Sequence, residues 1–138
     1  MKSAPKFLKI LVIEDNLINQ RLASTLFSRL GHQVDVAMNG LLGVELFKEK
    51  KHDLILMDIQ MPVMTGLEAA QAIREHEKNE KEQKPAVIIA VTTFNHYTDR
   101  ENCLRSGMND HISKPYKPDE ILSLVSRLIP DFVMPDHM

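Results

Sequence analysis

Cysteine is almost absent from this sequence: Cys103 is the single thiol among 138 residues. One thiol cannot form an internal disulfide, which excludes a disulfide-stapled secreted domain and fits a reducing compartment. Long apolar runs are absent as well, since no stretch approaches the roughly 18 residues needed to cross a membrane. The run that begins at Ile10 ends at Glu14 and Asp15, with no signal-peptide cleavage site after it. We therefore expect a cytoplasmic protein with no membrane partner.

A strong charge of either sign is also lacking. The 17 basic and 19 acidic residues leave a net charge of −2, so no global field attracts nucleic acid or an anionic membrane. The five glycines are scattered and form neither a P-loop nor a dinucleotide-binding motif. The six histidines show no metal-ligand spacing. A nucleotide cradle and a zinc site are therefore not expected.

Short apolar runs alternate with amphipathic segments along the chain. Strands are predicted at 9–13, 34–37, 54–57, 86–91 and, more weakly, 111–113. Helices are predicted where Ile18, Leu22, Leu26 and Leu30 recur every four residues before Gly31, at 41–50, from 65 into the charged stretch EHEKNEKEQK, at 98–106 and after Pro118.

This alternation predicts an α/β fold. Strands that are apolar on both faces and joined by helical crossovers form a parallel sheet covered on both sides. Right-handed crossovers then give a doubly wound, three-layer (βα)₅ architecture. Residues 8–129 are expected to form this single domain, after a leader at 1–7 and before a tail at 130–138.

Chemically active side chains follow the ends of four predicted strands, and the carboxyl ends of parallel strands are where such folds place their sites. They are Glu14 and Asp15 after the first strand, Asp58 after the third, Thr92 and Thr93 at the end of the fourth and Lys114 after the fifth. Three carboxylates in one place repel one another unless they share a cation. Ligands that are all oxygen suit Mg²⁺.

A metal ion, a lysine and a strand-end hydroxyl are the groups that typically support phosphoryl transfer. The metal ion and the lysine neutralise charge on the phosphoryl oxygens, and the hydroxyl donates a hydrogen bond to one of them. Since no nucleotide cradle accompanies them, the phosphoryl group must come from another phosphorylated species. A carboxylate can then be the covalent acceptor. These residues also have ordinary alternatives: Asp58 as a turn residue, Thr92 as an ordinary strand-end hydroxyl, and Lys114 as a surface lysine. The run Glu14-Asp15-Asn16 could simply cap the first helix, a role that suits Asn16 and leaves Asp15 free to bind metal.

Four stretches carry a resemblance to a known family: ILVIEDN at 10–16, LILMDIQMPVMTGLEA at 54–69, AVTT at 90–93 and SKP at 113–115. In this order and spacing they resemble the receiver domain of bacterial two-component response regulators, over about residues 8–129. The INQ at 18–20 is closest to receivers of hybrid histidine kinases. The resemblance implies a flavodoxin-like fold with strand order 2-1-3-4-5, and phosphoryl transfer from a phosphohistidine to an aspartate.

The resemblance also implies a magnesium centre around the acceptor. Asp58 would be the phosphoacceptor. Asp15 would bind Mg²⁺ directly and Glu14 largely through water, together with Asp58 and the backbone carbonyl of Gln60. Mn²⁺ is an expected substitute for Mg²⁺.

Two further residues would act on the phosphoryl group. Lys114 would pair with the Asp58 carboxylate and then with phosphate, and the family has a cis peptide between this lysine and Pro115. Thr92 would move toward the phosphoryl group and repack the surface formed by the fourth helix, fifth strand and fifth helix.

Some positions depart from the family pattern or vary within it. His111 stands where a tyrosine or phenylalanine switch residue is usual. It is either a packed histidine or a switch whose charge makes the output pH-sensitive. Thr93 replaces a small alanine and crowds Asp58. Phe94 and Gln60 occupy positions that tune the lifetime of the aspartyl phosphate, and the bulk of Phe94 predicts slow self-dephosphorylation.

The expected partner is a sensor histidine kinase or a histidine phosphotransfer protein, with no direct contact to nucleic acid. We expect a monomer, with dimerisation on phosphorylation as an alternative, and no enzymatic turnover beyond slow self-dephosphorylation. The short leader after Met1 favours a stand-alone regulator over a domain of a hybrid kinase. Two competing functions are an unphosphorylated interaction module and a Mg²⁺-dependent aspartyl phosphatase. The phosphatase needs a second acid two residues after the nucleophile, where this chain has Gln60.

Overall fold

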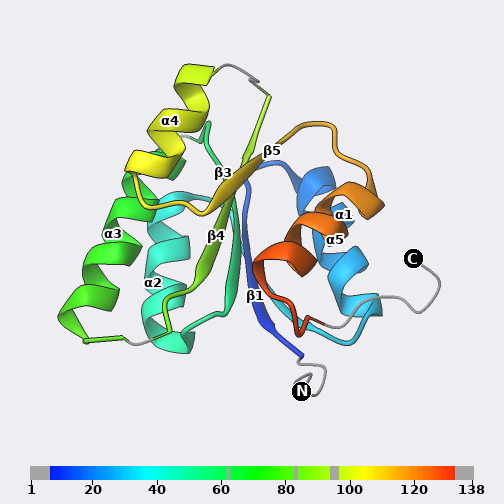
Figure 1. Ribbon diagram of the computed structural model, residues 1–138, viewed down its shortest axis with the longest axis horizontal. Coiled ribbons are helices and arrows are strands. Elements are labelled where there is room, and N and C mark those ends of the chain that lie inside the picture. The colour runs from blue at the N-terminus through cyan, green and yellow to red at the C-terminus, as the bar shows by residue number, and fades with distance from the viewer. Residues whose placement is uncertain (1–6, 62, 83, 94–96, 133–138) are drawn as a thin grey trace.

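The computed structural model describes residues 7–61, 63–82, 84–93 and 97–132. Strands and helices alternate along the chain (Figure 1). The strands are β1 (Lys9–Ile13), β2 (Gln33–Ala37), β3 (Leu54–Asp58), β4 (Val87–Thr92) and β5 (Asp110–Ser113), and the helices are α1 (Leu17–Arg29), α2 (Gly40–Lys50), α3 (Gly66–Asn79), α4 (Tyr97–Arg105) and α5 (Pro118–Leu128). All strand pairs are parallel, in the order β2-β1-β3-β4-β5. The predicted fold and strand order are confirmed.

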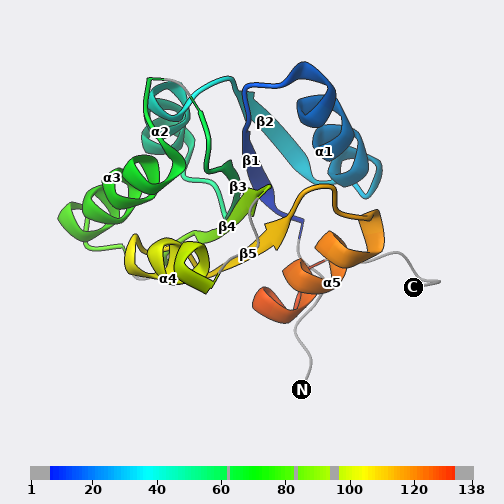
Figure 2. The same ribbon diagram turned by 90° about the horizontal axis from the view of Figure 1, so that it is seen from above.

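The helices form a layer on each face of the sheet. Figure 2 shows α1 and α5 on one face and α2, α3 and α4 on the other, with β2 and β5 at opposite edges. Each layer closes its own buried apolar cluster against the sheet. Within the described part of the chain, no helix has the length and apolar character that crossing a membrane requires.

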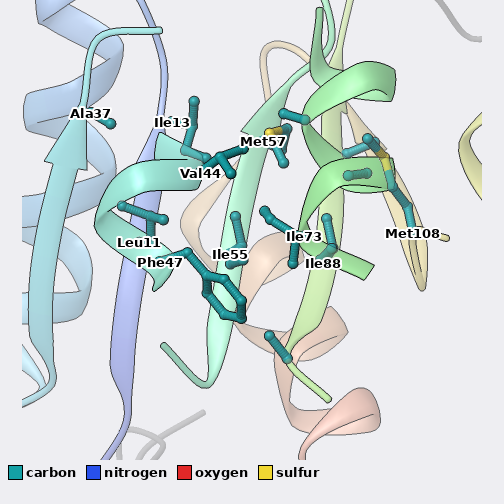
Figure 3. Packing of buried hydrophobic residues seen from close by; sticks show 14 of the residues in the cluster. Leu11, Ile13, Ala37, Val44, Phe47, Ile55, Met57, Ile73, Ile88 and Met108 are labelled. Carbon is teal, nitrogen blue, oxygen red and sulfur yellow. The ribbon is translucent and has the colours of Figure 1, made fainter. Parts of the chain in front are cut away.

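The central strand β3 is buried along its whole length. Leu54 and Leu56 pack in the cluster under α1 and α5, whereas Ile55 and Met57 pack under α2 and α3 (Figure 3). Successive side chains of a strand point to opposite faces, so a run that is apolar throughout belongs between two layers. Its last residue, Asp58, is therefore held by a strand that is packed on both sides.

The helix termini match local signals in the sequence. Asn16 caps α1 by accepting the Asn19 N–H at 3.0 Å. Thr65 and Glu68 form a reciprocal capping box at the start of α3, and Pro118 occupies the first turn of α5, where its missing N–H is not needed. These signals place the predicted helices within a residue or two of their observed bounds.

Helix α1 buries a different face from the one that its leucine and isoleucine repeat suggests. Ile18 and Leu22 are 69% and 65% exposed, while Ala23 and Phe27 are buried. Both pairs are four residues apart, so both fit a helical period. The repeat identifies the helix correctly, but its first half, Ile18 and Leu22, faces solvent, while Leu26 and Leu30 are partly buried against the core.

The expected C-terminal tail begins with a packed residue. Phe132 is buried, and its ring stacks on His32 with centroids 4.7 Å apart and lies edge-on to Phe27. His32 in turn accepts the Leu8 N–H at its Nδ1, at 3.0 Å. Phe132 thus completes the apolar cluster under α1 and α5, at the end of the sheet remote from Asp58.

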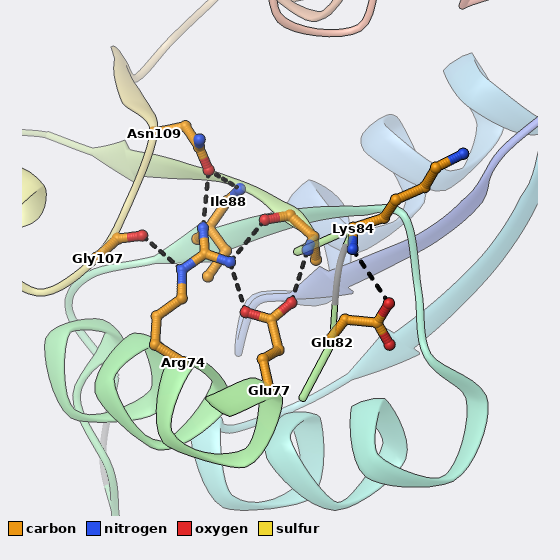
Figure 4. Close-up of polar contacts among 8 residues, drawn as sticks. Arg74, Glu77, Glu82, Lys84, Ile88, Gly107 and Asn109 are labelled. Atoms are coloured by element: carbon orange, nitrogen blue, oxygen red, sulfur yellow. Dashed lines mark hydrogen bonds and ion pairs between the residues drawn. The ribbon is translucent and has the colours of Figure 1, made fainter. Parts of the chain in front are cut away.

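A polar network ties α3 to the segments that enter β4 and β5 (Figure 4). Arg74 donates to the carbonyls of Gly107 and Ala86, both at 2.8 Å, to the Glu77 carboxylate at 2.7 Å and to the Asn109 side chain at 2.9 Å. Glu77 is buried and also accepts the Ala86 N–H at 2.7 Å. A buried carboxylate is tolerated only when it is paired and hydrogen-bonded, and Arg74 fulfils both conditions.

Replacing Arg74 by alanine is expected to destabilise the protein by about 3 kcal/mol, because Glu77 and two backbone carbonyls would lose their partner. Urea unfolding of wild type and R74A measures the difference. The control is R105A, since Arg105 is 78% exposed and lies 3.9 Å from Glu101. That exposed pair contributes about 0.5 kcal/mol or less. Equal losses in both variants would contradict this account of the network.

Candidate functional site

The chemically active residues predicted at the strand ends lie at the carboxyl edge of the sheet. The register pairs Ile13 with Met57, so Glu14 leaves β1 beside Asp58, the end of β3. Thr92 ends β4 opposite Ser113, which precedes Lys114. Residues far apart in the sequence therefore meet because parallel strands end at one edge.

Three carboxylates form one cluster there. One side-chain oxygen from each of Glu14, Asp15 and Asp58 lies within 4.8 Å of the other two. Glu14 and Asp58 are buried, at 5% and 6% exposure, whereas Asp15 is exposed. The predicted acidic group is thus brought together, with two acids in the floor of the site and one at its rim.

Lys114 supplies the positive charge of the site. Its Nζ lies 2.7 Å from Glu14 Oε1 and 3.4 Å from Asp58 Oδ2, so the lysine contacts both buried acids and is closer to Glu14. Its backbone N–H donates to the Thr92 carbonyl at 2.7 Å. The Lys114–Pro115 peptide is cis, as expected.

The loop after β3 holds the Asp58 carboxylate from the other side. The Gln60 N–H donates to Asp58 Oδ1 at 3.0 Å. Gly66 packs against the strand end so closely that a Cβ there would lie 2.5 Å from the Asp58 carbonyl oxygen. A side chain at this position would displace the end of β3 or the start of α3.

Burial and mutual repulsion set the charges of this cluster. Burial, together with the hydrogen bond to Glu14, raises the pKa of Asp58 to about 6 from an ordinary 3.8. Burial also opposes ionisation of Glu14, but the hydrogen bonds to Lys114 and Asp58 outweigh it and lower the Glu14 pKa. Burial likewise opposes the Lys114 charge, yet the two carboxylates raise the Lys114 pKa. Above pH 6 one ammonium faces two buried carboxylates.

The remaining predicted residues lie around this centre. Thr92 is buried and Thr93 is exposed, with the Thr93 hydroxyl donating to the Gln60 side chain at 3.2 Å. His111 is partly buried on β5, and its Nδ1 lies 3.6 Å from an Asp110 carboxylate oxygen. Phe94 lies outside the described residues.

Gln20 belongs to the site although it entered the sequence analysis only as part of the INQ resemblance. Its side-chain amide donates to the Glu14 carbonyl at 2.6 Å, which fixes the backbone that carries the buried acid. In the sequence alone, a polar residue six positions after Glu14 on a predicted helix cannot be identified as part of the site. The contact depends on how α1 turns back over the end of β1.

A cavity of about 440 Å³ opens beside Asp58, between α1 and the loop that leads to α5. Leu22, Leu26 and Tyr116 line it together with Asp58 and Lys114. This apolar wall is not predictable from the helical repeat that contains Leu22, because the repeat does not indicate which leucines face the site.

The sequence profile of the response regulator receiver domain matches residues 10–126. The chain belongs to this family. It is a receiver domain of two-component signalling. The resemblance to this family and the flavodoxin-like fold that it implied are both confirmed. A curated relative, hybrid signal transduction histidine kinase B of Dictyostelium discoideum, is 45% identical over 124 residues, which are 85% of this chain and 6% of the kinase.

Two solved receiver domains are closely similar. The receiver domain of Saccharomyces cerevisiae Ssk1, solved with the histidine phosphotransfer protein Ypd1, has a TM-score of 0.86 and 33% identity, covering 98% of this chain and 97% of that one. The receiver of the sensor histidine kinase PA1611 from Pseudomonas aeruginosa, with magnesium in its active site cleft, has a TM-score of 0.78 and 35% identity, covering 91% and 99%.

These matches correct one expectation. Relatives at 31% to 45% identity come from a slime mould, rice and yeasts, so the expected bacterial source is contradicted. This chain spans only a small part of such relatives: its match covers 6% of the Dictyostelium kinase and 25% of the fission yeast regulator mcs4.

Replacing Asp58 by asparagine is expected to stabilise the metal-free receiver at pH 7.5 by about 1 to 2 kcal/mol. The folded-state pKa of about 6 lies above the ordinary 3.8, so ionised Asp58 destabilises the fold once the pH exceeds 6. The full shift corresponds to about 3 kcal/mol, and screening by solvent at the open side of the site reduces it.

Urea unfolding in a chelator at pH 7.5 and pH 5 tests this sign. The gain from D58N should be present at pH 7.5 and shrink at pH 5, where wild-type Asp58 is largely protonated. The control is E49Q, which removes the charge of an exposed carboxylate. A loss of stability in D58N, or an equal gain at both pH values, would contradict the repulsion.

Proposed function

We propose that this receiver accepts a phosphoryl group on Asp58 from a phosphohistidine of a sensor kinase or a histidine phosphotransfer protein. The observation that carries the proposal is the cluster at the sheet edge, in which buried Asp58 lies within reach of Glu14, Asp15 and the Lys114 ammonium. The solved complex of the similar Ssk1 receiver with Ypd1 supports a phosphotransfer protein as the donor.

The residues present fit a Mg²⁺ ion. The carboxylate ligands are all oxygen, and the raised pKa of Asp58 marks a surplus of negative charge in the cluster. Glu14, Asp15 and Asp58, with the Gln60 carbonyl, would hold the ion, and Mn²⁺ has a similar preference for oxygen. When bound, the ion would neutralise charge on the phosphoryl oxygens.

The chain's own residues have distinct tasks in the transfer. An Asp58 carboxylate oxygen attacks phosphorus while the bond from phosphorus to the donor imidazole nitrogen breaks, and the imidazole leaves with that electron pair. The Gln60 N–H holds the carboxylate in orientation. Lys114, already 3.4 Å from Asp58, can donate to a phosphoryl oxygen as negative charge is transferred onto the acyl phosphate.

The receiver acts as a switch and not as an enzyme in this proposal. Asp58 phosphate draws Thr92 toward it and shifts the surface of α4, β5 and α5, where His111 occupies the switch position. The phosphoryl group must favour the active arrangement by a few kcal/mol, because only that difference moves the population. Hydrolysis is limited to slow self-dephosphorylation, for which Phe94 is the proposed shield.

An apolar face of α1 beside the acceptor is suited to dock the donor protein. Leu17, Ile18 and Leu22 are each more than 60% exposed, and Ile18 and Leu22 line a shallow hollow with Pro118 at the start of α5. An exposed apolar patch of this kind marks an interaction surface. Its position next to the Asp58 cavity lets a docked protein present a phosphohistidine.

Incubation with Mg²⁺ and acetyl phosphate is expected to add the mass of one phosphoryl group to the wild-type chain, measured by intact mass spectrometry. D58A should show no adduct, because it lacks the nucleophile. D119A, which removes an exposed aspartate of α5, is the matched control and should be labelled like wild type. An unlabelled wild type, or equal labelling of D58A, would refute the acceptor assignment.

I18D is expected to slow phosphoryl transfer from a phosphorylated histidine phosphotransfer protein by about tenfold or more, since burying an unpaired carboxylate in an apolar interface weakens docking. Labelling by acetyl phosphate should be unchanged, because Ile18 is not among the residues that line the Asp58 cavity. L42D, on a different surface, is the control for an added charge. If I18D accepts the phosphoryl group at the wild-type rate, the assignment of the docking face is wrong.

A further inference from the structure

A second apolar surface lies at the β2 edge of the sheet, next to the α1 docking face, with which it shares Leu17. Strand β2 has one neighbour, β1, and lies between α1 and α2 (Figure 2). A groove of about 610 Å³ runs there, which we call the edge groove; it is lined chiefly by Leu17, Val36, Met38, Leu42, Glu45 and Glu49.

The apolar wall of the edge groove is exposed to an unusual degree. Leu17, Met38 and Leu42 are 67%, 57% and 47% exposed, and Val36 is 38% exposed although it belongs to a strand. These side chains come from α1, β2, the loop after β2 and α2, and they form one surface instead of scattered positions. Monomeric proteins rarely leave contiguous apolar patches uncovered unless a partner covers them.

The charges on the groove decide between possible occupants. Glu45 and Glu49 lie one helical turn apart on α2 and both line the groove. Among the described residues no cation pairs with either, and the nearby Lys50 is paired with Asp35 at 3.3 Å. A second copy of this chain would bring two more glutamates to the same interface, which is unfavourable. A partner with basic residues beside an apolar stripe is complementary.

The groove is also connected to the phosphoacceptor site. Ala37, at its floor, accepts the Glu14 N–H at 3.0 Å. Gln20, at its wall, donates to the Glu14 carbonyl at 2.6 Å. Both backbone polar groups of the buried acid are therefore held by residues that line the groove, while Asp58 itself stays open on the other side of α1.

We propose that the edge groove docks a basic amphipathic helix of a partner protein or domain, and that this helix can stay bound while Asp58 is phosphorylated. Helix binding suits a surface built from three elements, because residues at i, i+3, i+4 and i+7 present one wide apolar stripe. Flanking lysines or arginines then meet Glu45 and Glu49. The proposal does not depend on the phosphoryl chemistry.

The probe is a synthetic peptide of about 15 residues with leucines at helical spacing and lysines on both flanks. Amide chemical-shift changes in the labelled receiver should map to α2, β2 and the start of α1. L42D, and separately the double variant E45K/E49K, should each weaken binding by about tenfold or more. Phosphorylation by acetyl phosphate in L42D should match wild type, which establishes that the variant is folded.

Two controls make the result specific. L104D is matched to L42D, because Leu104 on α4 is also 47% exposed, and it should bind the peptide like wild type. A peptide with the same leucines and glutamates in place of the lysines should bind about tenfold more weakly than the basic peptide. Equal binding by L42D, equal binding of the acidic peptide, or concentration-dependent self-association that L42D abolishes would each overturn the proposal.

Discussion

The repulsion between two buried carboxylates, Glu14 and Asp58, is the constraint on which the site depends. Water would separate such charges, but the sheet holds both acids at one edge and excludes most of the solvent. One ammonium, that of Lys114, contacts both and cannot neutralise both. The cluster therefore has a place for further positive charge, either a proton or a metal ion, and each relieves the same repulsion.

The rest of the fold makes that repulsion possible. A carboxylate whose pKa is raised destabilises the folded state in neutral solution, so the strand that carries it needs stabilisation from elsewhere. Strand β3 obtains this from the apolar clusters on both of its faces. Gly66 then lets the chain turn closely over the strand end, and the Gln60 N–H orients the carboxylate without adding charge. The packing of β3 on both faces and the close turn at Gly66 therefore keep the Asp58 carboxylate near Glu14.

The sequence predicts best what depends on neighbours along the chain. Asn16, Thr65 and Pro118 mark helix starts through local hydrogen bonds and backbone geometry. The parallel arrangement of the strands follows from the helical crossovers, whereas their order was implied by the family resemblance. It predicts poorly what depends on the packing of distant segments. Nothing local distinguishes the buried Ala23 and Phe27 from the exposed Ile18 and Leu22, because both pairs have the same period. The closer approach of Lys114 to Glu14, and the contacts of Arg74 with the entries to β4 and β5, likewise appear only once the elements are assembled.

Helix α1 connects an exposed apolar surface with the carboxylate cluster. A helix that buried its leucines and isoleucines would pack more apolar area under the sheet, yet α1 buries Ala23 and Phe27 and presents Leu17, Ile18 and Leu22 to solvent. The same helix carries Gln20, whose amide holds the backbone of Glu14. A protein that covers this face therefore contacts the helix that positions one of the two repelling acids. The exposed apolar face and the support of Glu14 belong to the same helix, so under the proposed function a docked partner could influence the charges around Asp58 by fixing α1 without contacting Asp58 itself.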